Sequence, residues 1–140
     1  MSGCVLDTDV VIAALDRADT HHPAAARALR RMARDDVQPL LSLINYAETL
    51  VRPAEAESTL RAAVSAIDTL GIHLIAPTPA IARDAARLRG LGISLADGFA
   101  LATARSRGAS LASFDVRVRR AVTSVGIELA PGAGQDRPAR

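Results

Sequence analysis

The sequence predicts an α/β domain with a short, mostly parallel central sheet of four to five strands flanked by helices. Short apolar runs alternate with longer segments in which apolar residues recur at the helical period. No internal repeat and no linker interrupts this alternation. A chain of 140 residues is long enough for one domain, which we expect over residues 1–130. Residues 131–140 are rich in Gly, Pro, Arg and Gln and are expected to be disordered.

The first half of the chain is expected to contain two strands and four helices. An apolar run ends abruptly at Asp7, Pro23 opens a helix, Ser42 is a good N-cap and Pro53 suits a helix start. In order, the expected elements are strand 4–6, helix 10–15, helix 24–34, strand 38–41, helix 43–51 and helix 54–70.

The second half is expected to repeat the alternation with shorter elements. Gly71 ends a helix, Pro79 begins the next one, and Gly108 and Gly126 stop two others. The expected elements are strand 72–75, helix 79–89, a helix between Ser94 and Gly108, strand 111–112, helix 117–125 and strand 127–129.

The composition limits both the core and the choice of partners. Hydrophobic residues make up 49% of the chain and aromatic residues only 2%, so the core must consist of Ala, Leu, Val and Ile. All 17 basic residues are arginine, which can bind phosphate in a bidentate manner. We interpret the early cluster 27–34 as a solvated helix face, whereas the late cluster 117–120 follows a candidate site residue.

The single cysteine, Cys4, has no partner for an internal disulfide or for a structural zinc site. No apolar stretch approaches the roughly 20 residues that a membrane span needs, and the N-terminus does not resemble a signal peptide. We therefore expect a cytoplasmic protein with no membrane partner. His21 and His22 are expected to be exposed at a helix start, without a metal-binding role.

Four acidic residues lie at positions where an α/β sheet places its functional groups. Asp7 and Asp115 follow apolar strands, and the carboxyl ends of parallel strands border the usual binding crevice. Glu48 and Asp97 lie in helices that can face the same crevice. Each acid also has a structural explanation. Asp7 and Asp115 can cap helices, Ser94 with Asp97 forms a capping box, and Glu48 can be a solvated helix residue.

Taken together, the acids favour a cation site over four unrelated caps. Unit charges about 4 Å apart repel by roughly 4 kcal/mol at an effective dielectric near 20, so converging carboxylates require a cation. Oxygen ligands without a His or Cys set favour a hard cation, Mg²⁺ or Mn²⁺.

These residues resemble the PIN-domain ribonucleases, and most closely the small VapC-type toxins of bacterial type II toxin–antitoxin pairs. The resemblance rests on the order of the four acids, the A-D-G-x-A-x-A-x-A segment at Asp97 and the Ser113-Phe114-Asp115 strand end. It covers the chain from about residue 5 to residue 129. It implies a three-layer PIN-like fold and an endoribonuclease that cleaves RNA with metal-activated water.

The resemblance also implies roles for individual residues. Asp7, Asp97 and Asp115 correspond to ligands of Mg²⁺ or Mn²⁺, Glu48 completes the catalytic quartet, and Ser113 is a supporting hydroxyl. A cognate antitoxin and a homodimer are the implied protein partners. Near the site in sequence, Arg117 and Arg119 are candidate RNA contacts.

Asp9 departs from the family pattern, which usually has Asn at this position. Asp9 either adds a carboxylate to the site or caps the first helix, and we favour capping. The segment Asp7-Thr8-Asp9 also fits a haloacid-dehalogenase-like phosphatase, with Asp7 as nucleophile and Asp9 as acid, although such enzymes use a lysine that this chain lacks. A non-catalytic module that binds nucleic acid or protein is the third alternative.

Overall fold

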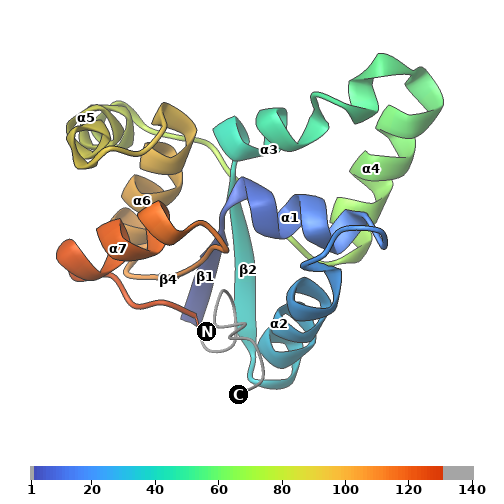
Figure 1. The fold of residues 1–140 in the computed structure, drawn as a ribbon, viewed down its shortest axis with the longest axis horizontal. Coiled ribbons are helices and arrows are strands. Elements are labelled where there is room, and N and C mark those ends of the chain that lie inside the picture. The colour runs from blue at the N-terminus through green and yellow to red at the C-terminus, as the bar shows by residue number, and fades with distance from the viewer. Residues whose placement is uncertain (1, 131–140) are drawn as a thin grey trace.

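The computed structural model describes residues 2–130, and within them four parallel strands form one sheet in the order β3-β2-β1-β4. Figure 1 labels β1, β2 and β4 of this sheet. The strands are β1 Ser2–Leu6, β2 Val37–Ser42, β3 His73–Ile75 and β4 Ser110–Ala112. Val5 of the central strand β1 lies beside Leu40 of β2 and Leu111 of β4. The expected α/β class and parallel sheet are confirmed. The expected strand 127–129 is wrong, because that segment contributes only one isolated bridge, from Leu129 to Leu111.

Seven α-helices and two short 3₁₀ turns connect the strands within the described residues. The helices are α1 Thr8–Leu15, α2 His22–Arg34, α3 Leu43–Leu50, α4 Glu57–Thr69, α5 Pro79–Leu88, α6 Leu95–Arg107 and α7 Val116–Ser124, with η1 Pro53–Glu55 and η2 Arg89–Leu91. The expected single helix 54–70 is wrong, because the backbone is extended at Ala56. The Thr59 hydroxyl donates to the Pro53 and Ala56 carbonyls at this break and so stabilises it.

The sheet is the middle of three layers. Figure 1 shows α5, α6 and α7 on one side of the sheet, and α1, α2 and α4 on the other. One apolar core surrounds Leu101 and Leu111, and the second surrounds Leu6 and Leu41. Within residues 2–130, no helix is both long enough and apolar enough to cross a bilayer.

Close packing of α6 explains the small residues that follow Asp97. A Cβ atom on Gly98 would lie 2.8 Å from the Ala85 carbonyl oxygen, so only glycine permits α5 and α6 to approach this closely. Buried alanines along α6, such as Ala100 and Ala104, continue the close contact. This packing fixes the start of α6, and hence Asp97, against α5.

The strand order also determines where a site can form. The chain passes from β1 to β2 on one side and later adds β4 on the other, so β1 and β4 flank a topological switch point. Leu6 of β1 pairs with Ala112 of β4, and the residues that follow them leave the sheet side by side. Asp7 and Ser113 occupy these two positions.

Candidate active site

Asp7 is the most buried of the candidate acids, with 2% of its surface exposed. Its backbone N–H donates to the Ala112 carbonyl at 2.9 Å, which joins the ends of β1 and β4. One carboxylate oxygen caps α1 by accepting from the Thr8 N–H at 2.9 Å, and the other accepts from the Ser113 hydroxyl at 2.7 Å. Burial raises the pKa of Asp7 to about 8, and the charges of Asp9 and Asp97 contribute in the same direction.

Asp9 points toward the same crevice and does not cap α1. Its carboxylate oxygens accept from the Phe114 N–H at 3.2 and 3.4 Å, across to the loop that follows β4. The capping interpretation is wrong because Asp7 is the N-cap residue of α1. Burial raises the pKa of Asp9 to about 6; the Phe114 bond opposes this shift, and the charges of Asp115 and Asp97 add to it.

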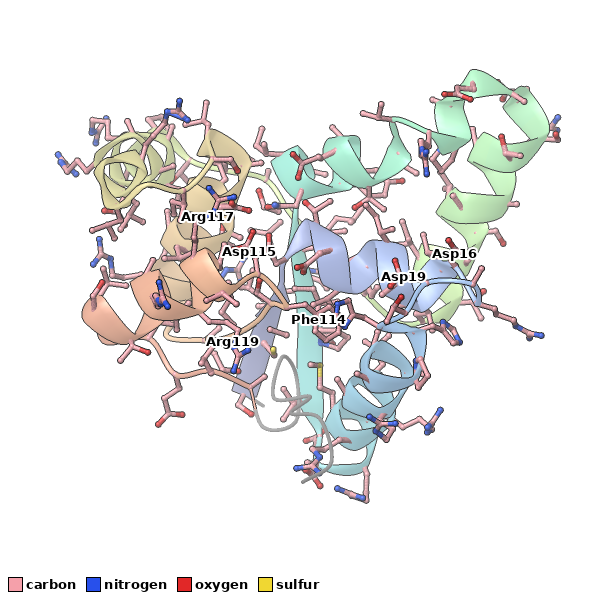
Figure 2. All side chains as sticks on the ribbon, in the orientation of Figure 1. Asp16, Asp19, Phe114, Asp115, Arg117 and Arg119 are labelled. Atoms are coloured by element: carbon pink, nitrogen blue, oxygen red, sulfur yellow. The ribbon has the colours of Figure 1, made fainter. Side chains whose placement is uncertain are left out.

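The remaining two aspartates combine a capping role with a place in the acidic cluster. Asp97 Oδ2 accepts from the Ser94 N–H at 3.3 Å and completes the expected capping box of α6. Asp115 Oδ1 caps α7 by accepting from the Arg117 N–H at 2.8 Å. Figure 2 shows Asp115 in the loop between β4 and α7, whereas Asp16 lies at the far end of α1.

The four aspartates therefore form one electrostatic cluster: Asp7, Asp9, Asp97 and Asp115. The charges of Asp9 and Asp97 raise the pKa of Asp7, and the charges of Asp115 and Asp97 raise the pKa of Asp9. Glu48 is an exposed residue of α3 and lies at the rim of this cluster. The Thr8 hydroxyl, between Asp7 and Asp9 in sequence, donates to Glu48 Oε1 at 2.5 Å.

The donor chemistry fits a hard divalent cation. Within residues 2–130, no three His, Cys, Asp or Glu side chains form a ready-made ligand group for a metal ion. Mg²⁺ usually binds one or two carboxylates and retains several waters, so a loose carboxylate cluster suits it better than a closed cage does. Carboxylate oxygens are the ligands that such a cation prefers, and Asp7, Asp9, Asp97 and Asp115 supply them here.

The model of the PIN domain family matches residues 4–123 of this chain. The chain belongs to the PIN domain family. The resemblance inferred from the acids is thereby confirmed. No curated protein sequence matches the chain.

Solved structures of toxin–antitoxin proteins share the fold of this PIN domain. VapBC2 from Rickettsia felis, bound to a promoter DNA fragment, is 16% identical and covers 94% of this chain and 95% of its own, with a TM-score of 0.67. VapC20 from Mycobacterium tuberculosis, a toxin that cleaves the sarcin–ricin loop, is 17% identical, with coverages of 84% and 94% and a TM-score of 0.67. A Klebsiella pneumoniae toxin–antitoxin complex is 22% identical, with coverages of 93% and 94% and a TM-score of 0.67.

Sequence reasoning missed two polar residues that support the acidic cluster of this PIN domain. Thr8 and Asn45 are 8% and 0% exposed, and the Asn45 amide nitrogen donates to the Thr8 hydroxyl at 3.0 Å. The same nitrogen donates to the Ala96 carbonyl, directly before Asp97, at 3.2 Å. The available signal was an amide residue one helical turn before Glu48, in a helix with few other polar residues.

The expectation that His21 and His22 are exposed is wrong, because both are half-buried. The His21 ring stacks on Phe114 with ring centroids 4.4 Å apart, and His22 Nδ1 lies 2.7 Å from the Ala13 carbonyl oxygen. The stack braces the loop whose Phe114 N–H binds Asp9. Nothing in the sequence pattern indicated this contact, since the two rings are far apart along the chain.

The candidate RNA contacts Arg117 and Arg119 do not share a face of α7. Residues two apart on a helix point in roughly opposite directions. Arg117 is exposed and Arg119 is half-buried, and Figure 2 shows Arg119 directed away from Asp115, toward the other end of the sheet. The Arg119 Nε atom is buried without a hydrogen-bond partner among the described residues. Only Arg117 has the exposure that a phosphate contact requires.

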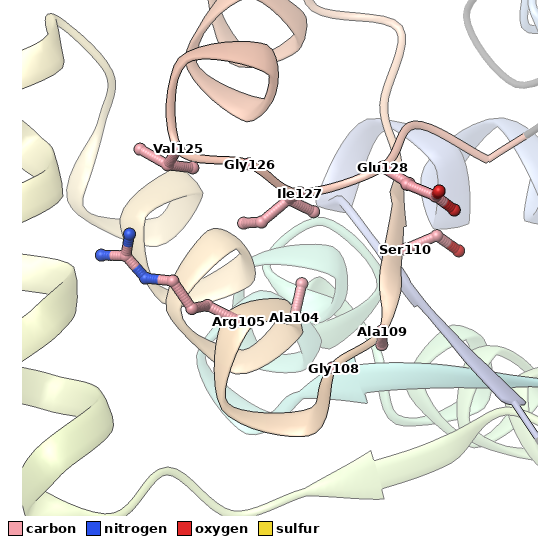
Figure 3. A pocket seen from close by; sticks show the side chains of 9 residues that line it. All are labelled: Ala104, Arg105, Gly108, Ala109, Ser110, Val125, Gly126, Ile127 and Glu128. Atoms are coloured by element: carbon pink, nitrogen blue, oxygen red, sulfur yellow. The ribbon is translucent and has the colours of Figure 1, made fainter.

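Several cavities lie outside the acidic cluster of the PIN domain, two of which bear on the extent of the site. A small one of about 220 Å³ lies where α6 ends and β4 begins, beside Gly108, Ser110 and Glu128 (Figure 3). It is at the opposite end of β4 from Ser113 and does not belong to the site. A larger groove of about 960 Å³ runs between α1, α3 and α4, and its wall includes Glu48.

Proposed function

We propose that this PIN domain is a divalent-metal-dependent endoribonuclease and the toxin of a bacterial type II toxin–antitoxin pair. The observation that carries the proposal is the convergence of Asp7 and Asp9 after β1, Asp115 after β4 and Asp97 at the start of α6, with the pKa values of Asp7 and Asp9 raised by burial and by neighbouring carboxylates. Further support comes from membership of the PIN family and from the fold shared with VapC20, which cleaves the sarcin–ricin loop.

In this proposal Asp7, Asp97 and Asp115 hold Mg²⁺ or Mn²⁺, and Asp9 adds negative charge beside them. A bound ion would supply Lewis-acid chemistry: polarisation of the scissile phosphate, a lower pKa for a water molecule and stabilisation of the leaving oxygen. Ser113 fixes the Asp7 carboxylate by its 2.7 Å hydrogen bond. Because the carboxylates repel each other and an RNA phosphate alike, binding of RNA and binding of the cation are expected to be mutually favourable.

Glu48 is the proposed general base. Its Oε1 accepts from Thr8, which orients the carboxylate and leaves Oε2 to accept a proton from the attacking water. The exposed position of Glu48 at the rim lets it reach water beside the bound phosphate. Thr8 thus connects the base to the segment that carries Asp7 and Asp9.

The test is an RNA cleavage assay with Mg²⁺ or Mn²⁺, an EDTA control, and the variant Asp97→Asn. The RNA panel includes a hairpin with the sarcin–ricin loop, tRNA and an unstructured RNA. Asparagine keeps an oxygen for the Ser94 N–H, so the capping box survives and only charge is lost. The matched control is Asp84→Asn, whose carboxylate pairs with Arg105 on the far side of α6. Cleavage that persists in EDTA and in Asp97→Asn would refute the proposal.

The same assay addresses the alternatives inferred from the sequence. A haloacid-dehalogenase-like phosphatase would hydrolyse a small phosphate ester and leave RNA intact, whereas a non-catalytic module would bind RNA without cleaving it. Membership of the PIN family argues against the phosphatase, since the family match includes Asp7 and Asp9. Both oxygens of Asp7 accept hydrogen bonds, which reduces its power as a nucleophile.

The cognate antitoxin is proposed to dock in the groove between α1, α3 and α4. Its wall is mostly apolar, with Ile12 and Leu15 from α1, Val51 after α3, and Ala63 and Ala66 from α4. An amphipathic helix can bury its apolar face in such a groove. Because Glu48 also lines the groove, a bound antitoxin would lie against the proposed general base.

Docking is tested with Ala63→Glu, which places a charge in the apolar groove, against Ser58→Glu on the exposed surface of α4. Ala63→Glu is expected to lose antitoxin binding and retain RNA cleavage, and Ser58→Glu to retain both. Equal antitoxin affinity of both variants would refute docking at this groove. A homodimer and a cytoplasmic location complete the proposal; light scattering of the purified protein and cell fractionation test them.

A further inference from the structure

Asn45 is a fully buried amide at the meeting point of three helices. It lies on α3, one helical turn before Glu48, and its side-chain nitrogen donates to Thr8 of α1 at 3.0 Å and to the Ala96 carbonyl of α6 at 3.2 Å. We propose that Asn45 is a positioning residue that holds Glu48 and Asp97 in register, acting through Thr8 and Ala96. This inference rests on the endoribonuclease function proposed above.

The bond to Ala96 determines which way the Asn45 amide faces. A carbonyl oxygen only accepts hydrogen bonds, so the group that contacts Ala96 must be the amide NH₂ and not the amide oxygen. The second hydrogen of the same NH₂ then points to the Thr8 oxygen. The amide orientation is therefore fixed by protein chemistry alone.

This orientation in turn directs the Thr8 hydroxyl proton. Because Thr8 accepts from an NH₂ group that cannot accept in return, its own proton is free for another acceptor, and that acceptor is Glu48 Oε1. A donor chain thus runs from Asn45 to Thr8 to Glu48. Loss of the Asn45 donor frees the Thr8 hydroxyl to rotate away from Glu48.

The second bond acts on the metal side of the site. Ala96 directly precedes Asp97, whose charge acts on both Asp7 and Asp9. The bond from Asn45 ties this first turn of α6 to α3. One side chain therefore sets the position of the proposed base and of a proposed metal ligand.

The energetics of the site argue against a purely stabilising role. The Asn45 Oδ1 atom is buried without a partner among the described residues, and a buried acceptor left unpaired destabilises the fold. An apolar residue of similar volume would avoid this cost. The amide at this position is therefore explained by the hydrogen bonds that its NH₂ group donates to Thr8 and Ala96.

The experiment compares Asn45→Leu, Thr8→Val and their double variant. Steady-state RNA cleavage gives kcat and KM, and calorimetric titration gives the affinity of the metal-free protein for Mn²⁺. Thr8→Val is expected to lower kcat about 10–100-fold with KM and Mn²⁺ affinity unchanged, because only the orientation of Glu48 is lost. Asn45→Leu is expected to lower kcat similarly and to weaken Mn²⁺ binding, because Asp97 also loses its support.

The double variant distinguishes a chain from two separate effects. If Asn45 acts through Thr8, adding Thr8→Val to Asn45→Leu causes no further loss of kcat. Thr103→Val, which removes another fully buried hydroxyl, from the middle of α6, is the matched control and is expected to keep wild-type kcat. If Asn45→Leu does not fold, Asn45→Ser and Asn45→Ala are compared in its place, because both side chains are small and only serine keeps a hydrogen-bond donor.

Three results would overturn the proposal: kcat losses of Asn45→Leu and Thr8→Val that multiply in the double variant, an Asn45→Leu protein with wild-type kcat, or Mn²⁺ affinity equal to wild type in Asn45→Leu. If the wild type binds Mn²⁺ but cleaves no RNA, the proposed function is wrong. The role of Asn45 in supporting Asp97 is then still tested by comparing the Mn²⁺ affinity of Asn45→Leu with that of the wild type. Absence of both Mn²⁺ binding and cleavage in the wild type would overturn both proposals.

Discussion

The Ser113 hydroxyl donates to Asp7 Oδ2 at 2.7 Å, across a sequence separation of 106 residues. The Ser113 hydroxyl oxygen also accepts from the Asp115 N–H at 3.1 Å. Ser113 is fully buried, so no water competes for either bond. One hydroxyl therefore connects the acid that follows β1 with the acid that follows β4, and the geometry of the site depends on it.

Replacing Ser113 by Ala is expected to lower Mn²⁺ affinity or RNA cleavage about 10–100-fold, the usual cost of removing an outer-shell partner of a metal ligand. The reason is that Asp7 loses one of its two fixed oxygens and the Asp115 N–H loses its acceptor. Ser110→Ala is the matched control, because its hydroxyl lies at the other end of β4, where it contacts the Gly3 carbonyl at 3.5 Å and the Cys4 side chain. Equal losses in the two variants would show that the strand, and not the Asp7 contact, matters.

Asp9→Asn is expected to reduce metal-dependent cleavage at least tenfold while leaving the metal-free protein folded. The asparagine oxygen can still accept from the Phe114 N–H, so the contact between α1 and the loop after β4 survives. What is lost is a charge that acts within the acidic cluster. The comparison is Asp16→Asn, at the exposed far end of the same helix. Wild-type activity of Asp9→Asn would exclude Asp9 from the metal site.

The sequence was sufficient for the class of the fold and for the acids at the strand ends. Alternating apolar runs predict parallel strands, and parallel strands place Asp7 and Asp115 at one edge whatever the detailed packing. The limits of the elements were less predictable, because the extended backbone at Ala56 depends on hydrogen bonds from the Thr59 side chain. The expected last strand failed because the segment pairs with β4 at a single bridge, Leu129 to Leu111, which does not extend into a ladder.

The contacts that complete the site could not be predicted from local pattern. Asp9 looked like a helix cap, and only the position of the Phe114 N–H reveals that it faces the crevice. Asn45 and His21 act through residues that are distant in sequence, Ala96 and Phe114. Such contacts depend on how the helices pack across the sheet, and helical periodicity carries no information about them.

The pH dependence of stability should reveal the strain in the metal-free site. Burial and neighbouring charges raise the pKa of Asp7 from 3.8 to about 8, so the folded protein binds a proton that the unfolded chain releases. The stability from this protonated group is complete below about pH 4 and is lost as the pH rises through about 8. Asp9 acts in the same direction, with a pKa of about 6.

Denaturant unfolding of metal-free wild type and Asp7→Asn at pH 5 and pH 8 tests this prediction. Asn stays neutral and can keep the cap of α1, so the variant is expected to gain stability over the wild type, by a difference of a few kcal/mol that is larger at pH 8 than at pH 5. Saturating Mn²⁺ should reverse the order at pH 8, since it stabilises the charged wild type. A variant less stable than metal-free wild type at pH 8 would contradict the raised pKa.

The two arginines that follow Asp115 should contribute unequally to RNA binding. Arg117 is exposed beside the site, whereas Arg119 is half-buried and directed away from Asp115. In the Asp97→Asn background, in which RNA is expected to stay uncut, Arg117→Ala is expected to weaken RNA binding. It is also expected to reduce the slope of log affinity against log salt by about 0.7–0.9, the loss of one phosphate contact. Arg119→Ala is expected to leave the slope unchanged. Unchanged affinity and salt dependence after replacement of both residues would remove α7 from the RNA-binding surface.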